Sequence, residues 1–433
     1  MSTIVGALAC QKDSFLKTLT TTVISCAEHK GHITPKDKQN KSKKSQDKKQ
    51  ESRYAIELGD TVIFPEGGGQ PSDIGIIDTG SDKIEVEEVI RDKLTALHLT
   101  HKPIDIGTKV DLSIDWQRRY DHMQQHTGQH LLSAIFDQYK LDTLSWSLGE
   151  TMNYIELPEK ISDELIEEVG EKVNQAIIDD IPITVEWPDD HGGEINISKI
   201  PDDYDLSKGL LRIVKIGNLD RNPCCGTHLK TTGQIQAVSI FHQLNVKGGN
   251  SRLFFTCGSR VFRQLSKNYN ILKNVGGNVL SCQIDDVYEK TKLLNDNYRD
   301  VAGTNRKLLA EVLGYEAKKV FDTLKTSKFA YFYRKDSNPE AIQIFQKELL
   351  TLINGSDCGI DLDKTHSVVM FNGEKNGLVK VMGPMTNEIV EKVKEILTGV
   401  KGGGKGIYQG KAVYEKGEVD SLLKYLESLT LES

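Results

Sequence analysis

Residues 123–134 have the sequence MQQHTGQHLLSA, which contains the pair His126 and His130. Apolar side chains and these histidines recur every three or four positions, and this spacing predicts a helix from about residue 118 to about residue 139. Residues four apart on a helix lie one turn above each other on the same face. The two imidazoles can therefore hold one metal ion between them.

His122 lies one further turn along the same face. Three ligands in this series would spread over about 12 Å of helix axis, which is too far for one ion. We therefore exclude His122 from the metal ligands. No glutamate follows His126, because the next residue is Thr127. The His-Glu-x-x-His pattern with its general base is missing, and the sequence disfavours a zinc metallopeptidase.

A second motif, NPCCGTH at residues 222–228, places Cys224 and His228 in Cys-x-x-x-His spacing. Three imidazole nitrogens and one thiolate form a set that suits tetrahedral zinc. We expect one Zn²⁺ per chain. The predicted ligands are His126, His130, Cys224 and His228. Cys225 is expected to be a small buried or turn residue beside the ligand. Four protein ligands are typical of structural zinc, whereas catalytic zinc keeps an open position, and the sequence leaves both open.

A third motif, FPEGGGQPSD, occupies residues 64–73. Gly67, Gly68 and Gly69 permit close backbone approach, and Gln70 offers both hydrogen-bond donors and an acceptor. Two interpretations are open: a cradle for a polar ligand, or a tight turn.

The composition limits the class of protein. The chain has 433 residues, of which 38% are hydrophobic and 27% are charged, which suits a globular protein of about two to four domains. The net charge is -7, so any contact with RNA must be local. No stretch approaches the roughly 18 apolar residues of a membrane span, and no basic leader precedes the short apolar run at the N-terminus. Seven scattered cysteines indicate reduced thiols, and a cytoplasmic protein is expected.

We expect an α+β chain that begins with a small, mostly β, β-barrel-like domain at residues 1–110. Alternating runs such as VISCA, TVIF and KIEVEEVI predict its strands. A Lys-rich insert at residues 30–52 interrupts it, and residues 36–49 carry seven lysines against two aspartates. This insert is expected to be disordered, either as a solvated loop or as an arm that contacts RNA phosphates.

Residues 111–260 mix helices and strands without a regular βαβ series, so this domain is expected to be α+β. A helix is predicted from Asp163 to Ile178, with Ser162 as its N-cap. Strands are predicted in the runs IPITVEW, LLRIVKI and SRLFFTC.

The remaining chain divides into two predicted segments. Residues 261–328 carry a heptad seam between Ile284 and Tyr315, which predicts a long coiled-coil-like helix or a helical hairpin with a turn near Gly303. Residues 329–433 are expected to form a small α/β domain. It includes the strand-like runs FAYFYR and HSVVMFN, a helix at about residues 386–397 and the glycine cluster VKGGGKGIYQGKA.

The motifs FPEGGGQPSD, MQQHTGQHLLSA and CCGTHLKTTGQI, in this order and at these separations, resemble the editing domain of alanyl-tRNA synthetases and of free-standing AlaX alanyl-tRNA editing proteins. The run NQAIIDDIPITVEW between the second and third motifs is also similar to that family. The resemblance covers roughly residues 53–260. No aminoacylation domain precedes these residues, so a free-standing editor is the closer match.

The resemblance implies a hydrolase that deacylates tRNA(Ala) mischarged chiefly with serine and, as a second substrate, with glycine. It implies the zinc ligands His126, His130, Cys224 and His228. It further implies that Thr127 recognises the serine hydroxyl and that Gln70 lines the pocket beside Gly67, Gly68 and Gly69. We therefore expect Thr127 and Gln70 as catalytic and substrate-binding residues. The family motif has glycine where this chain has Cys225.

The glycine cluster from Gly402 to Gly410 resembles the glycine-rich end domain of alanyl-tRNA synthetases. This resemblance implies tRNA contact, or a homodimer through residues 261–433. The alternative is a turn between a strand and a helix.

Two functions remain open from the sequence. The first is a zinc-dependent trans-editing hydrolase, and the alternative is a catalytically inactive tRNA-binding adaptor that retains the zinc fold. The hydrolase would cleave Ser-tRNA(Ala) and spare Ala-tRNA(Ala), whereas the adaptor would bind tRNA without accelerating deacylation.

Overall fold

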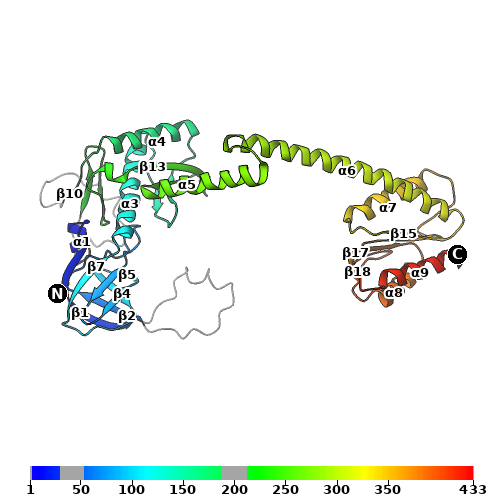
Figure 1. The fold of residues 1–433 in the computed structure, drawn as a ribbon, viewed down its shortest axis with the longest axis horizontal. Coiled ribbons are helices and arrows are strands. Elements are labelled where there is room, and N and C mark those ends of the chain that lie inside the picture. The colour runs from blue at the N-terminus through cyan, green and yellow to red at the C-terminus, as the bar shows by residue number, and fades with distance from the viewer. Residues whose placement is uncertain (1, 30–52, 187–211, 433) are drawn as a thin grey trace. The chain divides into compact units, whose positions relative to one another are not determined.

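The computed structural model describes residues 2–29, 53–186 and 212–432. The predicted Lys-rich insert lies outside the described residues. The chain forms two compact units, Met1–Ile271 and Leu272–Ser433, which are treated separately below (Figure 1). Within the described ranges, no helix is long and apolar enough to cross a membrane.

The first unit begins with a short helix and a seven-stranded antiparallel sheet in the order β4-β3-β7-β1-β2-β6-β5. Its elements are α1 (Ala9–Lys12), β1 (Thr18–His29), β2 (Arg53–Leu58), β3 (Gly75–Asp78), β4 (Lys83–Val86), β5 (Glu88–Asp92), β6 (Thr95–Thr100) and β7 (Lys109–Ile114). Alternation places Ile84 and Val86 of β4 in the core. The mostly β character agrees with the sequence, whereas barrel-like closure stays a prediction. Strand β7 continues past residue 110, where the sequence places the first domain boundary. The division of the chain into four domains at residues 110, 260 and 328 stays a prediction.

The run TVIF at residues 61–64 is not a strand, contrary to the sequence prediction. Side chains and the loop N–H groups of Cys10 and Asp73, rather than a neighbouring strand, bind its backbone. The Phe64 N–H donates to Asp73 Oδ2 at 2.8 Å, and Arg119 Nη2 donates to the Val62 carbonyl at 2.7 Å. The alternation of apolar residues there reflects burial in the core and not strand pairing.

His98 in β6 is a fully buried histidine whose ring nitrogens lie 2.8 Å from Thr61 Oγ1 and 3.0 Å from the Ile56 carbonyl. Burial lowers the pKa of His98 to about 4. In the unfolded chain a histidine pKa is about 6.5, so between these values the unfolded state binds a proton that the native state does not.

We expect the free energy of unfolding to fall by about 3 kcal/mol through His98 as the pH is lowered from about 6.5 to about 4. Urea denaturation at a series of pH values should show a smaller loss in His98→Gln than in the wild type. His242, which is exposed, provides the control variant His242→Gln. An unchanged pH dependence in His98→Gln would contradict the assignment.

The rest of the first unit packs the helices α3 and α4 against two antiparallel sheets, with strand orders β13-β14-β9-β8 and β10-β11-β12. Its elements are α3 (Trp116–Asp137), β8 (Ser145–Ser147), β9 (Asn153–Leu157), α4 (Asp163–Ile178), β10 (Ile183–Glu186), β11 (Ile213–Ile216), β12 (Asp220–Pro223), η2 (Thr232–Ile235), β13 (Val238–Asn245), β14 (Ser251–Cys257) and α5 (Ser259–Asn274). Helix α4 has the predicted bounds, and the Ser162 side chain accepts the Leu165 N–H. Strands β10, β11 and β14 confirm the three strand predictions in this region over the described residues, whereas residues 187, 210 and 211 of the predicted runs lie outside them.

Helix α3 is held against β14 by residues inside the histidine motif. Gln125 accepts the Cys257 N–H at 2.9 Å and donates to the Cys257 carbonyl at 3.0 Å. Glycine inside a helix costs about 1 kcal/mol relative to alanine. A Cβ at Gly128, however, would lie 2.2 Å from Cys257 Sγ. The glycine between the two histidines therefore permits the close approach of α3 and β14.

The second unit is built around a five-stranded sheet in the order β15-β16-β17-β19-β18. Among its described strands, β15 and β16 pair in parallel, and the other neighbouring pairs are antiparallel. Its elements are η3 (Val275–Leu280), η4 (Ile284–Asp286), α6 (Val287–Leu324), β15 (Phe329–Arg334), α7 (Pro339–Asn354), β16 (Ser367–Asn372), β17 (Asn376–Met382), α8 (Thr386–Ile396), β18 (Lys401–Gly403), β19 (Ile407–Val413) and α9 (Glu418–Glu432). Helices α6 and α7 cover one face of the sheet, and α8 and α9 cover the other (Figure 1).

Two details of this unit differ from the sequence predictions. Helix α6 continues through Gly303, so the long helix holds over residues 287–324 and the alternative of a turn near Gly303 does not. The glycine cluster forms the hairpin of β18 and β19, with Gly402 paired to Gly410, and it is not a turn between a strand and a helix. Positive φ angles at Gly404 (145°) and Gly406 (81°) accommodate this hairpin turn.

Candidate metal centre

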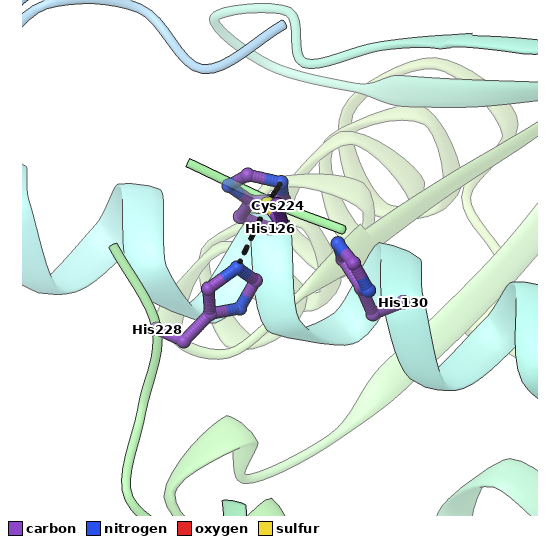
Figure 2. Close-up of side chains that lie close together, drawn as sticks. All are labelled: His126, His130, Cys224 and His228. Carbon is purple, nitrogen blue, oxygen red and sulfur yellow. Dashed lines mark hydrogen bonds between the residues drawn. The ribbon is translucent and has the colours of Figure 1, made fainter. Parts of the chain in front are cut away.

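The four predicted ligands come together at one point (Figure 2). His126 and His130 project from α3, and Cys224 and His228 lie on the segment that follows β12. Their ligating atoms all lie within 4.8 Å of one another. Cys224 Sγ is 3.4 Å from His126 Nε2 and 3.2 Å from His228 Nε2. His122 is not part of this group.

Each of the three imidazoles has a partner at its other ring nitrogen. His126 Nδ1 lies 2.9 Å from Gln70 Oε1, His130 Nδ1 lies 3.0 Å from Asp220 Oδ2, and His228 Nδ1 lies 3.2 Å from Thr127 Oγ1. Such outer partners fix the orientation of a ligating histidine and leave its remaining nitrogen for a metal. The Nε2 atoms of His126 and His228 face Cys224 Sγ.

The charges at this cluster also suit a metal. Burial raises the pKa of the Cys224 thiol, but His126 and His228 outweigh this effect and lower it well below its ordinary value. Burial lowers the pKa of His126, and it lowers that of His228 to about 3. Burial also lowers the pKa of His130, but hydrogen bonds to Asp220 and Cys224 raise it to about 10. A thiolate beside two neutral imidazoles provides three of the protonation states that zinc ligands require, and His130 would release its proton when a metal binds.

The glycine motif forms a tight turn that carries Gln70 into the site. Gly67 and Gln70 exchange backbone hydrogen bonds of 3.1 Å, and the residues between them, Gly68 and Gly69, have φ angles of 56° and 73°. L-residues with side chains rarely adopt such angles. Gln70 is fully buried, and its amide also donates to Thr227 Oγ1 at 2.8 Å. The turn therefore positions a partner of His126.

Gly226 lies directly against the His126 ring. A Cβ at this position would be 2.2 Å from His126 Cε1 and 2.9 Å from Gln70 Oε1. Only glycine lets the Cys224–His228 segment approach the histidine this closely.

Gly226→Ala is expected to weaken zinc binding by about 10- to 100-fold, because the added methyl group displaces a ligand ring and its outer partner. Competition with a chromophoric chelator measures the affinity. Gly314→Ala is the matched control, since nothing lies within 4 Å of the added Cβ. Equal zinc affinity in Gly226→Ala and the wild type would contradict the geometry.

Two further residues form the surroundings of the metal centre. The half-buried Trp146 ring lies 5.0 Å, centroid to centroid, from His126, and a Cβ on Gly69 would meet it at 2.6 Å. Cys225 is not one of the four clustered ligands, and its Sγ would lie 3.2 Å from a Cβ on Gly68. Cys225 therefore lies between the ligand Cys224 and the glycine turn.

Sequence reasoning missed Asp220 and Trp146. Asp220 stands four residues before Cys224, and an acidic residue so close to a metal motif is a signal that could have indicated an outer partner of a ligand. Trp146 gives no such signal, because an isolated aromatic residue in a polar run is more often part of a core. Thr127 and Gln70 both contact ligand imidazoles and are fully buried, and their roles toward a substrate stay predictions.

Two protein-family models match the chain. The model of class II (A) tRNA synthetases matches residues 9–118. The model of the second additional domain of threonyl- and alanyl-tRNA synthetases matches residues 211–254. The second match includes Cys224 and His228.

Relatives match nearly the whole chain. It is 37% identical over 443 residues to a Saccharomyces cerevisiae protein named for alanyl-tRNA editing, alaX, with 94% of this chain and 93% of the relative covered. It is 32% identical to the alanyl-tRNA editing protein Aarsd1 of Mus musculus over 430 residues, which cover 96% of this chain and 97% of the relative. It is 29% identical to the alanyl-tRNA editing protein AlaX-L of Pyrococcus horikoshii, and the match covers 82% of this chain and 87% of the relative. The resemblance inferred from the three motifs is thereby confirmed, and the chain belongs to the family of alanyl-tRNA editing proteins.

Proposed function

We propose that this protein removes serine, and secondarily glycine, from mischarged tRNA(Ala) by zinc-dependent hydrolysis of the aminoacyl ester. Membership of the editing family makes it a hydrolase of mischarged tRNA. The observation that supports zinc is the cluster of three imidazoles and one thiol, whose ligating atoms lie within 4.8 Å of one another. The outer partners of all three imidazoles add to this support.

Bound zinc would supply positive charge and Lewis acidity beside Cys224 and the three histidines. The protein's own residues orient the ligands: Gln70 fixes His126, and Asp220 fixes His130. Trp146 and the backbone of Gly68 and Gly69 lie beside this cluster and would limit the space for the amino acid. Small aminoacyl groups such as serine and glycine fit such a restricted site.

Thr127 and Gln70 are the residues that we propose to act on the substrate. Support comes from their position, since each lies one hydrogen bond from a ligand imidazole. A group that hydrogen-bonds the serine hydroxyl discriminates strongly against alanine, which lacks it. We propose this recognition for Thr127, with Gln70 and Gly67, Gly68 and Gly69 as substrate-binding residues.

The alternative function is a tRNA-binding adaptor without turnover. One observation favours it: four protein groups can complete the zinc coordination, as in structural sites. In that case the cluster would stabilise the fold, and tRNA binding would be the retained activity.

We further propose a homodimer through residues 261–433. Its support is an exposed apolar stripe on α6, where Tyr298, Val301 and Leu308 are 71%, 67% and 56% exposed.

All seven cysteines are free, which agrees with our proposal of a reducing compartment such as the cytoplasm.

The test is deacylation of Ser-tRNA(Ala), Gly-tRNA(Ala) and Ala-tRNA(Ala) by the purified full-length chain, with zinc measured on the same sample. Release of serine with alanine spared, at about one zinc per chain, supports the editing hydrolase. Zinc and tRNA binding without faster deacylation would identify the adaptor instead. Thr127→Val, which keeps the side-chain shape, is expected to reduce cleavage of the serine ester more than that of the glycine ester.

A further inference from the structure

Two buried side chains bind three successive carbonyls, those of Cys224, Cys225 and Gly226, in the segment that carries two of the predicted ligands. Arg212 Nη1 donates to the Cys224 carbonyl at 3.0 Å and to the Gly226 carbonyl at 2.6 Å. Gln11 Nε2 donates to the Cys225 carbonyl between them at 2.7 Å. Three successive peptide groups are therefore held on one side by side chains from elsewhere in the unit.

Both donors are rigidly anchored. Gln11 is fully buried, and its Oε1 accepts the N–H groups of Gly6 at 2.6 Å and Leu8 at 3.2 Å. Arg212 is 2% exposed and donates through Nε to the Gln11 carbonyl at 3.2 Å. The two side chains thus form one connected support beneath the turn.

In a trans peptide the N–H points away from the preceding carbonyl. Because the carbonyls of residues 224–226 face Gln11 and Arg212, the following N–H groups face the other way. The Gly226 N–H lies 3.4 Å from Cys224 Sγ, and the Thr227 N–H lies 3.0 Å from Gln70 Oε1. These two donors point at atoms of the metal centre.

The Cys225 N–H belongs to the same series, and among the described residues it contacts only the thiol of its own side chain. It is turned away from Arg212, toward the half-exposed side of the turn where Cys225 lies beside Gly68. A fixed N–H that contacts only a weakly accepting thiol within the described part of the chain, next to a predicted metal ligand, is suited to donate to an oxygen of a bound molecule.

We infer that the Cys225 N–H donates a hydrogen bond to the carbonyl oxygen of the aminoacyl ester, and that Gln11 and Arg212 are the residues that position it. The inference rests on the proposed hydrolase function. When water adds to the carbonyl carbon, the π electron pair moves to that oxygen, and the N–H stabilises the resulting charge. The carbon–oxygen bond to the ribose then breaks, and the ribose oxygen takes the proton released by the water.

The first experiment uses Gln11→Glu, which keeps an oxygen for Gly6 and Leu8 but removes the donor to the Cys225 carbonyl. We expect kcat on Ser-tRNA(Ala) to fall about 10- to 100-fold with zinc content unchanged and KM changed less than kcat, because a small misplacement of a group whose hydrogen bond strengthens in the transition state has this effect. The matched control is Gln243→Glu, since Gln243 forms the same pair of contacts with the Ile161 backbone. That variant should retain wild-type kcat.

The second experiment removes the N–H itself. Lactic acid incorporated at position 225 replaces the peptide N–H by an ester oxygen, and Cys225→Ala has the same side chain with the N–H intact. We expect kcat to be about 100-fold lower with lactic acid than with alanine, at equal zinc content, as for the loss of one oxyanion donor. If Gln11→Glu does not fold, the comparison of lactic acid with alanine at position 225 still tests whether the Cys225 N–H contributes to catalysis.

A third readout does not depend on turnover. In protein labelled with ¹⁵N-cysteine, a non-hydrolysable amide-linked seryl-adenosine should shift the Cys225 N–H resonance downfield and leave those of Cys26 and Cys358 in place. An unmoved Cys225 resonance, or equal kcat for lactic acid and alanine at position 225, would overturn the inference. Absence of turnover in the wild type would instead refute the proposed hydrolase.

Discussion

Cys224→Ala is expected to lose zinc and deacylation of Ser-tRNA(Ala) together. Cys224 contributes the only sulfur among the four clustered ligands, and its Sγ lies 3.4 Å or less from two of the imidazoles. Loss of an outer partner of a ligand typically weakens metal binding 10- to 100-fold, and loss of the ligand itself should exceed about 100-fold. Zinc content after dialysis and kcat/KM on the same preparation provide the measurement.

The neighbouring cysteine supplies the control. Cys225→Ala should retain about one zinc per chain, because Cys225 is not among the clustered ligands. His126→Ala should behave like Cys224→Ala, since it removes another member of the cluster. Equal zinc content in Cys224→Ala and the wild type would defeat the ligand assignment.

Arg119→Met is expected to lower the free energy of unfolding by about 3 to 5 kcal/mol. Arg119 and Asp73 form an ion pair in which both side chains are 0% exposed, and Arg119 also donates to the carbonyls of Ser14 and Val62. Removing the arginine leaves a buried carboxylate without its countercharge. Urea denaturation at neutral pH measures the loss.

Two comparisons test this explanation. Lys83→Met breaks a pair with Asp78 in which the side chains are 73% and 37% exposed, and it should cost at most about 1 kcal/mol. The double variant Asp73→Leu with Arg119→Met should recover part of the lost stability, because no unpaired charge is then buried. A double variant less stable than Arg119→Met would contradict the ion-pair explanation.

The ion pair also affects the metal centre. Asp73 follows Gln70 in the segment after the glycine turn, and Arg119 lies on α3, the helix that carries two of the ligands. Their pairing therefore fixes the position of Gln70 relative to His126. We expect Arg119→Met to weaken zinc binding as well as stability.

The sequence by itself determined the features that depend on neighbouring residues. Spacing of four positions on one helix brought His126 and His130 together, and Cys-x-x-x-His spacing supplied Cys224 and His228. Helix α4 was predictable in full because its N-cap, Ser162, acts within one turn of the chain. These outcomes follow from local geometry, which a short stretch of residues specifies.

Only the tertiary structure decided which distant side chains complete the site. Gln11 lies 214 positions from Cys225 in the sequence, yet its side chain binds the Cys225 carbonyl. Asp220 lies 90 positions from His130, yet their side chains are in contact. The run TVIF has the alternation of a strand, yet Asp73 and Arg119 occupy its backbone groups and no strand forms. Backbone polar groups must find partners, but nothing in a local pattern says whether a strand or a remote side chain provides them. The candidate metal ligands are therefore predictable from the sequence motifs, whereas the side chains that support them are decided by the tertiary structure.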